Sequence, residues 1–513
     1  MHPSATPGRP DDVPEAVAAG GRGVPSVLLF TLSAAAPLTV AAGAMTIGYA
    51  VTGRTGLAPA LLAVALVLAL FTVGYVAMSH RIATVGGFHA HVARGLGRPA
   101  GVGVAWVALI ARNALQVGLY GLVGAAGAPL LVLCFGVAPS WWLLTLAAWA
   151  LVAVLGVLRV DVTGPALAVL LSAQVIVLLV FDLGQLLRPA DGTVDLAPLS
   201  PAHLVAPGVG ALFVVAVIGF VGFESAVLLR EESRDPRRTV PAATYLAVGT
   251  VGVLLAFTAW TTTVATGPDR VVAAAGEQGV ELLFNLAGEH LGAGVVPIGL
   301  AVLTTSVLAA LVSLHHSVAR YAFALGRERV LPAAFGRATP RTGAPRVASA
   351  AQSVLGFVVI AGCVVAGVDP VRDLFYRAAV LGGLGLLLAT TVTSLAVLVF
   401  FVRVPTGEHP WRRMVAPGLA TVALVAMSGA ALADVGTLLG GPAESVSRWA
   451  FPAVFPLVAL LGTGWALRLR ARHPRGYARL GLGPEGAAAE LLAPPGGPER
   501  PVPLYGRSGR DRS

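Results

Sequence analysis

Lysine is absent from this 513-residue chain, and charged residues of every kind are scarce. Only 12% of the residues are charged, whereas a soluble domain carries about 25%, and 56% are hydrophobic. The mean hydropathy is +0.81. This composition excludes an ordinary soluble domain and makes the lipid bilayer the expected solvent for most of the chain.

Cysteine is nearly absent too, since Cys134 and Cys363 are the two that occur. Two distant cysteines exclude a disulfide scaffold and a CxxC metal site. His315 and His316 are adjacent, so they face different sides of a helix, and no HExxH spacing supports zinc. Because no motif for a nucleophile or a metal set occurs, we expect no enzymatic activity, no metal and no cofactor.

Long apolar runs dominate what is present. A helix needs roughly 20 apolar residues to cross a bilayer core. About twelve stretches satisfy this requirement, and they are continuous rather than alternating, which excludes a β-barrel. The predicted fold class is an all-α integral membrane protein with spans at 26–51, 57–79, 99–124, 140–158, 162–187, 206–229, 241–266, 293–325, 347–367, 371–402, 414–437 and 449–469.

Arginine alone sets the expected orientation of these spans. With the N-terminus in the cytoplasm, most loop arginines fall on the inner side, including Arg94, Arg98, Arg237 and Arg238. This asymmetry follows the positive-inside rule and explains the net charge of +10 without nucleic acid. We therefore expect a multi-pass protein of the cytoplasmic membrane. Its two cytoplasmic ends are an N-terminal tail, 1–25, and a disordered tail, 471–513.

Two predicted spans share an interruption. The first span contains Pro37, Gly43 and Gly48, and the sixth contains Gly219 and Gly222. Proline removes a helix hydrogen bond, and glycine tolerates unwound backbone. Interruptions five spans apart favour an inverted-repeat transporter with its site near the bilayer midplane. The alternative is that Gly and Pro only help these helices to pack.

Three motifs on the predicted inner side carry a family resemblance. They are GFVGFESA followed by EESRDPRRTVPAA, GGFHAHVARGLGRPAG (86–101) and HHSVARYAFALGRERVLPAAFGRATPRTGAP (315–345). In this order they resemble the sixth span with its following loop, the loop after span two, and the eighth span with its loop in amino-acid permeases. These permeases belong to the amino acid–polyamine–organocation superfamily. The resemblance covers roughly residues 26 to 400 and is not specific for a substrate.

The resemblance implies a core of two inverted five-helix repeats with broken helices 1 and 6. The repeats would be 26–187 and 206–402 within the core 26–402, and 403–470 would form peripheral helices 11 and 12. Exposed backbone at the two breaks would hold the carboxylate and amine of the substrate. The matching positions are Ala42, Gly43, Ala44, Ile218, Gly219, Phe220, Val221 and Gly222, and we expect Phe220 to act as a lid.

The chain departs from the family pattern in three places. It has Ala-Gly-Ala where many relatives carry a Gly-Ser-Gly-like motif in span one. Relatives selective for arginine have tryptophan at the position of Ile218, which argues against a large cationic substrate. Some proton-coupled relatives use a lysine in span five in place of sodium, and the lack of lysine excludes that mechanism.

Glu224 and Arg112 are the ionisable residues of greatest interest. An ionisable side chain inside the bilayer is energetically costly, so a functional role is the first hypothesis for each. Glu224 is expected either to carry the coupling proton or to cap the amides of the second half of span six. For Arg112 we keep three hypotheses: a bound anion, a buried pair with Glu224 or Asp182, and hydrogen bonds to carbonyls between helices.

Several uncharged polar residues are further candidates. Asn113 and Gln116 lie at helical spacing in span three, where they contact substrate or serve packing. Ser306, Thr304 and Thr305 offer oxygens to a sodium ion, although a proton is the favoured coupling ion. The charged segment from Glu231 to Arg238 forms a solvated inner face that doubles as a candidate gate.

The sequence thus predicts a secondary transporter for amino acids or related small amines, either proton-coupled or an exchanger, that works by alternating access. Its expected partners are the small-molecule substrate, a proton and the lipid bilayer, and no nucleic acid. The alternatives are a transporter-like sensor without transport, a permease for polyamines or organic anions, and a channel.

Overall fold

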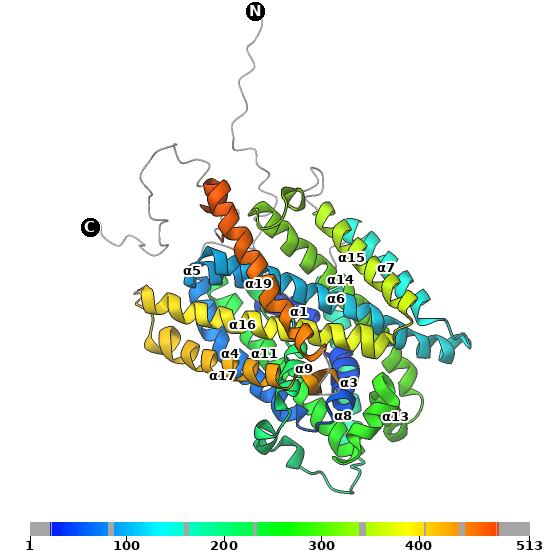
Figure 1. The fold of residues 1–513 in the computed structure, drawn as a ribbon. Helices are drawn as coiled ribbons and strands as arrows, with labels where there is room; N and C mark the ends of the chain where they lie inside the picture. Colours follow the sequence, from blue (N-terminus) through cyan, green and yellow to red (C-terminus); the bar gives the residue numbers. More distant parts are fainter. Residues whose placement is uncertain are drawn as a thin grey trace, which may run out of the picture.

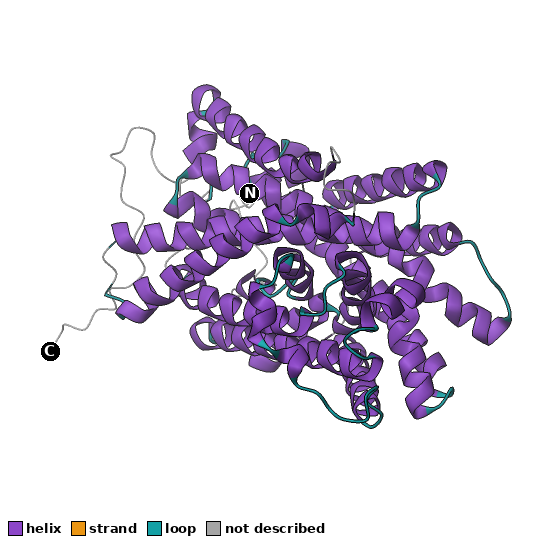
Figure 2. Ribbon diagram, turned by 60° about the horizontal axis from the view of Figure 1, so that its bottom comes forward, coloured by secondary structure: helices purple, strands orange, loops and turns teal. Residues whose placement is uncertain are grey.

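The computed structural model describes residues 21, 23–80, 87–158, 164–228, 233–337, 345–404, 407–440, 447–478 and 480–481. The regular elements in these ranges are helices, which pack as one bundle (Figure 1). Figure 2 shows the same bundle from another side, with loops joining the helices. Of the predicted inner-face segment from Glu231 to Arg238, Glu231 and Glu232 lie outside the described residues.

Ten helices of the described ranges are long and apolar enough to cross a membrane, which confirms the all-α integral membrane class. Each lies within or overlaps a predicted span. They are the composite α1–α3 (Val24–Thr52), α4 (Leu57–Ser79), α6 (Arg98–Phe135), α8 (Gly164–Leu186), α11 (Pro236–Thr266), α14 (Val295–Arg327), α15 (Arg346–Ala366), α16 (Arg377–Arg403) with its preceding π-turn η7 (Pro370–Tyr376), α17 (Ala416–Ala433) with η8 (Trp411–Val415), and α19 (Ser447–Arg472).

Two further apolar helices are shorter than the others. They are α7 (Trp141–Leu158) and α9 (Val209–Gly219), and they correspond to the predicted spans 140–158 and 206–229. Helix α9 is short because the chain leaves the helical path at Phe220 and resumes it only in α10 (Ser225–Leu228). The count of twelve spans and the inverted repeat stay predictions.

Short helices connect the spans. Helix α5 (Gly87–Gly95) packs against α6 and α16, and α13 (Leu282–Leu291) packs against α8. The others are α12 (Val271–Gln278), α18 (Val435–Leu439), α20 (Pro474–Ala478), η2 (Ala197–Leu199), η3 (Pro201–Val205), η5 (Gly279–Glu281) and η6 (Ala333–Gly336).

The centre of the bundle is formed by α6, which packs against α14, α16 and α19 (Figure 1). The outer helices are apolar all round, and they leave large side chains uncovered, such as Val365 in α15, Val422 in α17 and Leu460 in α19. A helix with apolar residues on every side suits either a core or lipid. These uncovered faces therefore fit contact with acyl chains.

The beginning of the tail predicted to be disordered is folded, which corrects that prediction. Helix α19 continues to Arg472, α20 follows, and Leu480 is only 3% exposed. Leu480 belongs to an apolar cluster with Val102 of α6 and Leu325 of α14. A tail rich in Pro, Gly and Arg still folds where a few apolar side chains find a matching surface, and composition alone does not show this.

Candidate functional site

The first span is interrupted where the sequence places Pro37. Proline lacks the amide hydrogen of a helix interior and disfavours a helical backbone at the residue before it. Ala36 accordingly adopts a left-handed conformation, with φ 43°, between α1 (Val24–Ala35) and α2 (Pro37–Thr39). The chain then forms a π-helical turn, η1 (Val40–Met45), before α3 (Thr46–Thr52).

The predicted break residues of span one, Ala42, Gly43 and Ala44, lie inside this π-turn. A π-turn widens the helix, disturbs the usual carbonyl pairing and is frequent at functional sites. The hydroxyl of Thr46 donates to the carbonyl of Ala42, and it lies 3.1 Å from that of Gly43. The turn is thus stabilised from within, and the sharper departure from helix occurs earlier, at Ala36.

The sixth span is interrupted over Phe220–Glu224. Of the predicted residues, Ile218 and Gly219 end α9, whereas Phe220, Val221 and Gly222 lie in the non-helical turns. Gly222 has φ 93°, a backbone conformation that side chains with a Cβ rarely adopt. Glycine at this position is what allows the chain to turn between α9 and α10.

The two interrupted spans lie against each other and run in opposite directions. A Cβ built on Gly222 would lie 2.6 Å from the Cβ of Ala34, and one built on Gly219 would lie 3.6 Å from Val40. Further along, a Cβ on Gly48 would lie 2.9 Å from Val215. The structure therefore places Gly222 and Gly219 of the sixth span against Ala34 and Val40 of the first span, which are far apart from them in the sequence.

Both breaks are shielded from solvent in this conformation. All eight predicted break residues are buried. Gly43 faces the ring of Phe375 in η7 and the side chain of Leu122 in α6. The ring of Phe220, 2% exposed, lies close to Gly252 of α11. A ligand would reach this backbone only after neighbouring helices move.

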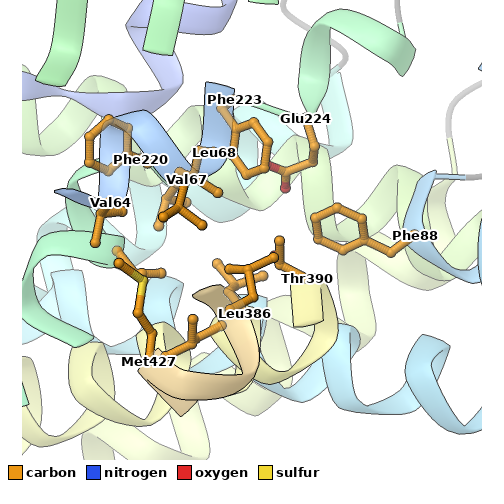
Figure 3. Close-up of a pocket in the computed structure, with 14 residues that line it drawn as sticks. Val64, Val67, Leu68, Phe88, Phe220, Phe223, Glu224, Leu386, Thr390 and Met427 are labelled. Atoms are coloured by element: carbon orange, nitrogen blue, oxygen red, sulfur yellow. The ribbon is translucent and has the colours of Figure 1, made fainter. Parts of the chain in front are cut away.

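A small cavity lies beside the second break (Figure 3). It is lined by Phe220, Val221, Phe223 and Glu224, by Phe88 of α5, by Thr390 of α16, and by apolar residues of α4, α9, α16 and α17. Its volume of about 20 Å³ is enough for a single water molecule. In Figure 3 the Glu224 carboxylate points into the space between Phe223 and Phe88. The conformation is closed around the breaks.

Arg112 and Glu224 form a buried ion pair. The Nη2 of Arg112 lies 2.7 Å from the Oε1 of Glu224, and both side chains are about 95% buried, with relative exposures of 6% and 4%. The guanidinium also lies 4.9 Å from the ring centre of Tyr321 in α14. Of the hypotheses for Arg112, the structure selects the pair with Glu224 over one with Asp182. The pair links α6 to the last residue of the interruption, directly before α10.

An aromatic layer lies next to this pair. The rings of Phe71 and Phe88 stand 6.1 Å and 6.4 Å from that of Phe223, and Tyr75 stacks on Phe71 at 5.0 Å. In α5, burial lowers the pKa of His91 to about 4, so this residue is neutral at pH 7 and packs on Tyr75. The layer closes the bundle between the breaks and α5.

Asn113 and Gln116 do not join the breaks. The amide of Asn113 donates to the carbonyl of Leu109 in its own helix at 2.8 Å. Gln116 is buried and bonds to His315 of α14 and Gln352 of α15, and His315 bonds to Ser349 of α15. The structure thus places Gln116 in a packing network of α6, α14 and α15.

One of the three hydroxyl residues considered for sodium lies at the first break. Ser306 bonds to Thr39 of α2 at 2.7 Å and to Gln174 of α8 at 2.8 Å. Thr304 bonds to the carbonyl of Ala126 in α6, and Thr305 is exposed. Gln174 was not a candidate from the sequence, although a buried amide in a membrane span is the kind of signal that marks one.

Comparison with known proteins shows which family the chain resembles in sequence. A sequence model of the family described as "Amino acid permease" matches residues 23–461. The chain is also 34% identical over 142 residues to uncharacterized transporters of Mycobacterium tuberculosis and Mycobacterium bovis. That match covers 28% of this chain and spans only 30% of the length of those relatives.

Proposed function

The chain belongs to the amino acid permease family, and from this premise we propose that it is a secondary active transporter for amino acids or related small amines. It works by alternating access, either coupled to protons or as an exchanger. It resides in the cytoplasmic membrane with both termini in the cytoplasm, as the distribution of its arginines favours.

The observation that carries this proposal is the antiparallel contact of two interrupted spans. Backbone that leaves the helical path offers amide donors and carbonyl acceptors that a regular helix uses internally. Amides at the start of a half-helix favour a carboxylate, and freed carbonyls favour an ammonium group. Two adjacent breaks therefore suit a ligand that carries both groups, as an amino acid does.

The proposed substrate site comprises Ala42, Gly43 and Ala44 with Ile218, Gly219, Phe220, Val221 and Gly222. Phe220 serves as the lid over the bound substrate. Ile218 and the apolar residues around it give no counter-charge to a cationic side chain, so we propose a neutral amino acid. Asn113 and Gln116, which bond elsewhere, are left out of this site.

The Arg112–Glu224 pair is proposed as an inner gate together with the aromatic layer. Breaking the pair would release the second half of span six from α6 and open a path between α5 and the breaks. Because Arg112 is already neutralised by Glu224, it is not free to hold a substrate anion in this state. The alternative of an organic-anion permease loses its main support.

The experiment that tests the proposal is ligand-induced thermal stabilisation of the purified protein in detergent. A ligand that binds only the folded state raises the melting temperature. Neutral L-amino acids are expected to raise it in a concentration-dependent manner, while polyamines and dicarboxylates serve as comparison ligands. Stabilisation by polyamines or dicarboxylates without any by amino acids would contradict the proposed substrate class.

A further inference from the structure

Asp182 is a buried carboxyl group without a cation beside it. It lies in α8, has 0% of its surface exposed, and sits four residues before the helix ends at Leu186, which is about 6 Å along the axis. Its two oxygens contact the hydroxyls of Thr258, at 2.8 Å, and Thr261, at 3.2 Å, both in α11. Both contacts are with uncharged groups.

The helices packed against α8 bring no charge to this group within the described residues. Helices α1 and α2 carry no titratable side chain, and those of α11 and α14 lie toward their other ends. In α13, Glu289 and His290 precede Leu291, whose side chain lies beside Gly184 of α8. No titratable side chain of α11, α13 or α14 forms a hydrogen bond or ion pair with Asp182 among the described residues. These side chains are Arg237, Arg238, Tyr245, Glu289, His290, His315, His316, Arg320, Tyr321 and Arg327.

The two carboxyl groups of the spans thus differ in their surroundings. Glu224 has the guanidinium of Arg112 as a counter-charge at 2.7 Å. An ionised Asp182 would be a buried anion compensated only by hydroxyl dipoles, which costs several kcal/mol. Adding a proton to the carboxylate removes that cost.

The hydrogen bonds around Asp182 fit a protonated carboxyl group. The Oγ1 of Thr258 lies 3.1 Å from the carbonyl of Leu254, and the Oγ1 of Thr261 lies 3.1 Å from that of Thr258. Each hydroxyl has one hydrogen, so two hydrogens face four acceptors if the carboxylate is ionised. A protonated Asp182 donates to the hydroxyl oxygen of Thr258 or Thr261. That hydroxyl then donates to the nearby carbonyl in α11, of Leu254 or of Thr258 respectively.

A polar stripe continues from Asp182 along α8. Gln185, one turn nearer the helix end, is 0% exposed, and neither amide atom has a hydrogen-bond partner among the described residues. Two turns in the other direction, Gln174 bonds to Ser306, which bonds to Thr39 beside the first break. Unsatisfied buried amides attract water. Water at Gln185 would therefore connect Asp182 with the end of α8.

We propose that Asp182 is a proton-binding site and holds its carboxyl group in the protonated form in this conformation. In this conformation Asp182 exchanges its proton with water at the end of α8, and coupling requires that the proton leave toward the opposite side of the bilayer in another conformation. The link between this proton site and transport rests on the proposed function. The proposal assigns the coupling proton to Asp182 and the gating role to Glu224.

Infrared spectroscopy of the purified protein tests this assignment without a known substrate. A protonated buried carboxyl group gives a carbonyl-stretch band that a carboxylate lacks. At neutral pH we expect this band in wild type and in Glu224→Gln, and its loss in Asp182→Asn. A shift of the band after labelling aspartate carboxyl groups with ¹³C identifies an aspartate even if the Asn variant fails to fold.

Absence of the band in wild type, or its survival in Asp182→Asn, would overturn the proposal. Melting temperatures in sodium chloride and in choline chloride test whether the site binds sodium instead of a proton. A sodium-dependent rise in melting temperature that Asp182→Asn removes would make it a cation site. These outcomes do not depend on the amino-acid screen, so failure of the proton site and failure of the proposed function are distinguishable.

Discussion

At the scale of single residues, the charged groups inside the spans separate into two kinds. Arg112 and Glu224 compensate each other, and Asp182 is compensated by neutral hydroxyls alone. The sequence showed that these residues were costly and therefore of interest, but not which of them meet. Pairing depends on how α6, α8 and span six face one another, and no local pattern encodes that.

The ion pair gives the first prediction. Arg112→Ala and Glu224→Gln should each lower the free energy of unfolding by about 3 to 5 kcal/mol, because each leaves a buried charge uncompensated. The double variant should lose less free energy of unfolding than the two single variants lose together, because the two side chains are in contact. Thermal melting in detergent measures all three variants.

A matched control is Arg377→Ala, which breaks the half-exposed pair with Asp373 at 2.9 Å. Pairs at the surface contribute about 0 to 1 kcal/mol, so this variant should melt close to wild type. Additive losses for Arg112→Ala and Glu224→Gln would show that the pair does not act as a unit.

At the scale of elements, proline and glycine placed both interruptions in the correct spans. Pro37 explains the left-handed Ala36, and Gly222 supplies the positive φ of the second break. The predicted centre of the first break, Ala42 to Ala44, is a π-turn six residues beyond the sharpest departure from helix. A π-turn leaves no distinctive residue in the sequence, since it depends on how neighbouring helices close around it.

Gln116 shows the same limit for a polar stripe. Helical spacing put it on one polar face of span three, with substrate contact and packing both open, and the residue is buried. The orientation of that face toward His315 and Gln352 depends on tertiary packing.

Gly222 gives the prediction at this scale. Gly222→Ala should destabilise the protein by about 1 to 3 kcal/mol from backbone strain alone, and the new Cβ would also collide with Ala34. Gly249→Ala is the control, because this glycine of α11 has open space around its missing Cβ. Melting temperatures of the two variants, measured side by side, check the prediction. Equal melting of both would contradict the assigned conformation of the second break.

At the scale of the whole molecule, hydropathy alone predicted the fold class, because each span must be apolar over a fixed length. It also placed the ten long spans, although helices extend beyond the apolar run in places: α6 continues to Phe135, eleven residues past the predicted end at 124. The folded start of the C-terminal tail was missed because its order depends on one buried leucine, Leu480, and the surface that receives it.

The closed conformation also belongs to this scale. The buried breaks, the Arg112–Glu224 pair and the aromatic layer together leave room for little more than one water beside the second break. Alternating access requires that this arrangement open to one side at a time. The account therefore rests on transport through the contact between span one and span six.

The most direct measurement of that claim is uptake of radiolabelled neutral amino acids by proteoliposomes that contain the purified protein. The account predicts saturable uptake that an inward proton gradient accelerates. Gly249→Ala should retain this uptake, and Gly222→Ala should lose it. Folded wild-type protein that moves no neutral amino acid with or without the gradient, or a Gly222→Ala variant that transports like wild type, would contradict the account.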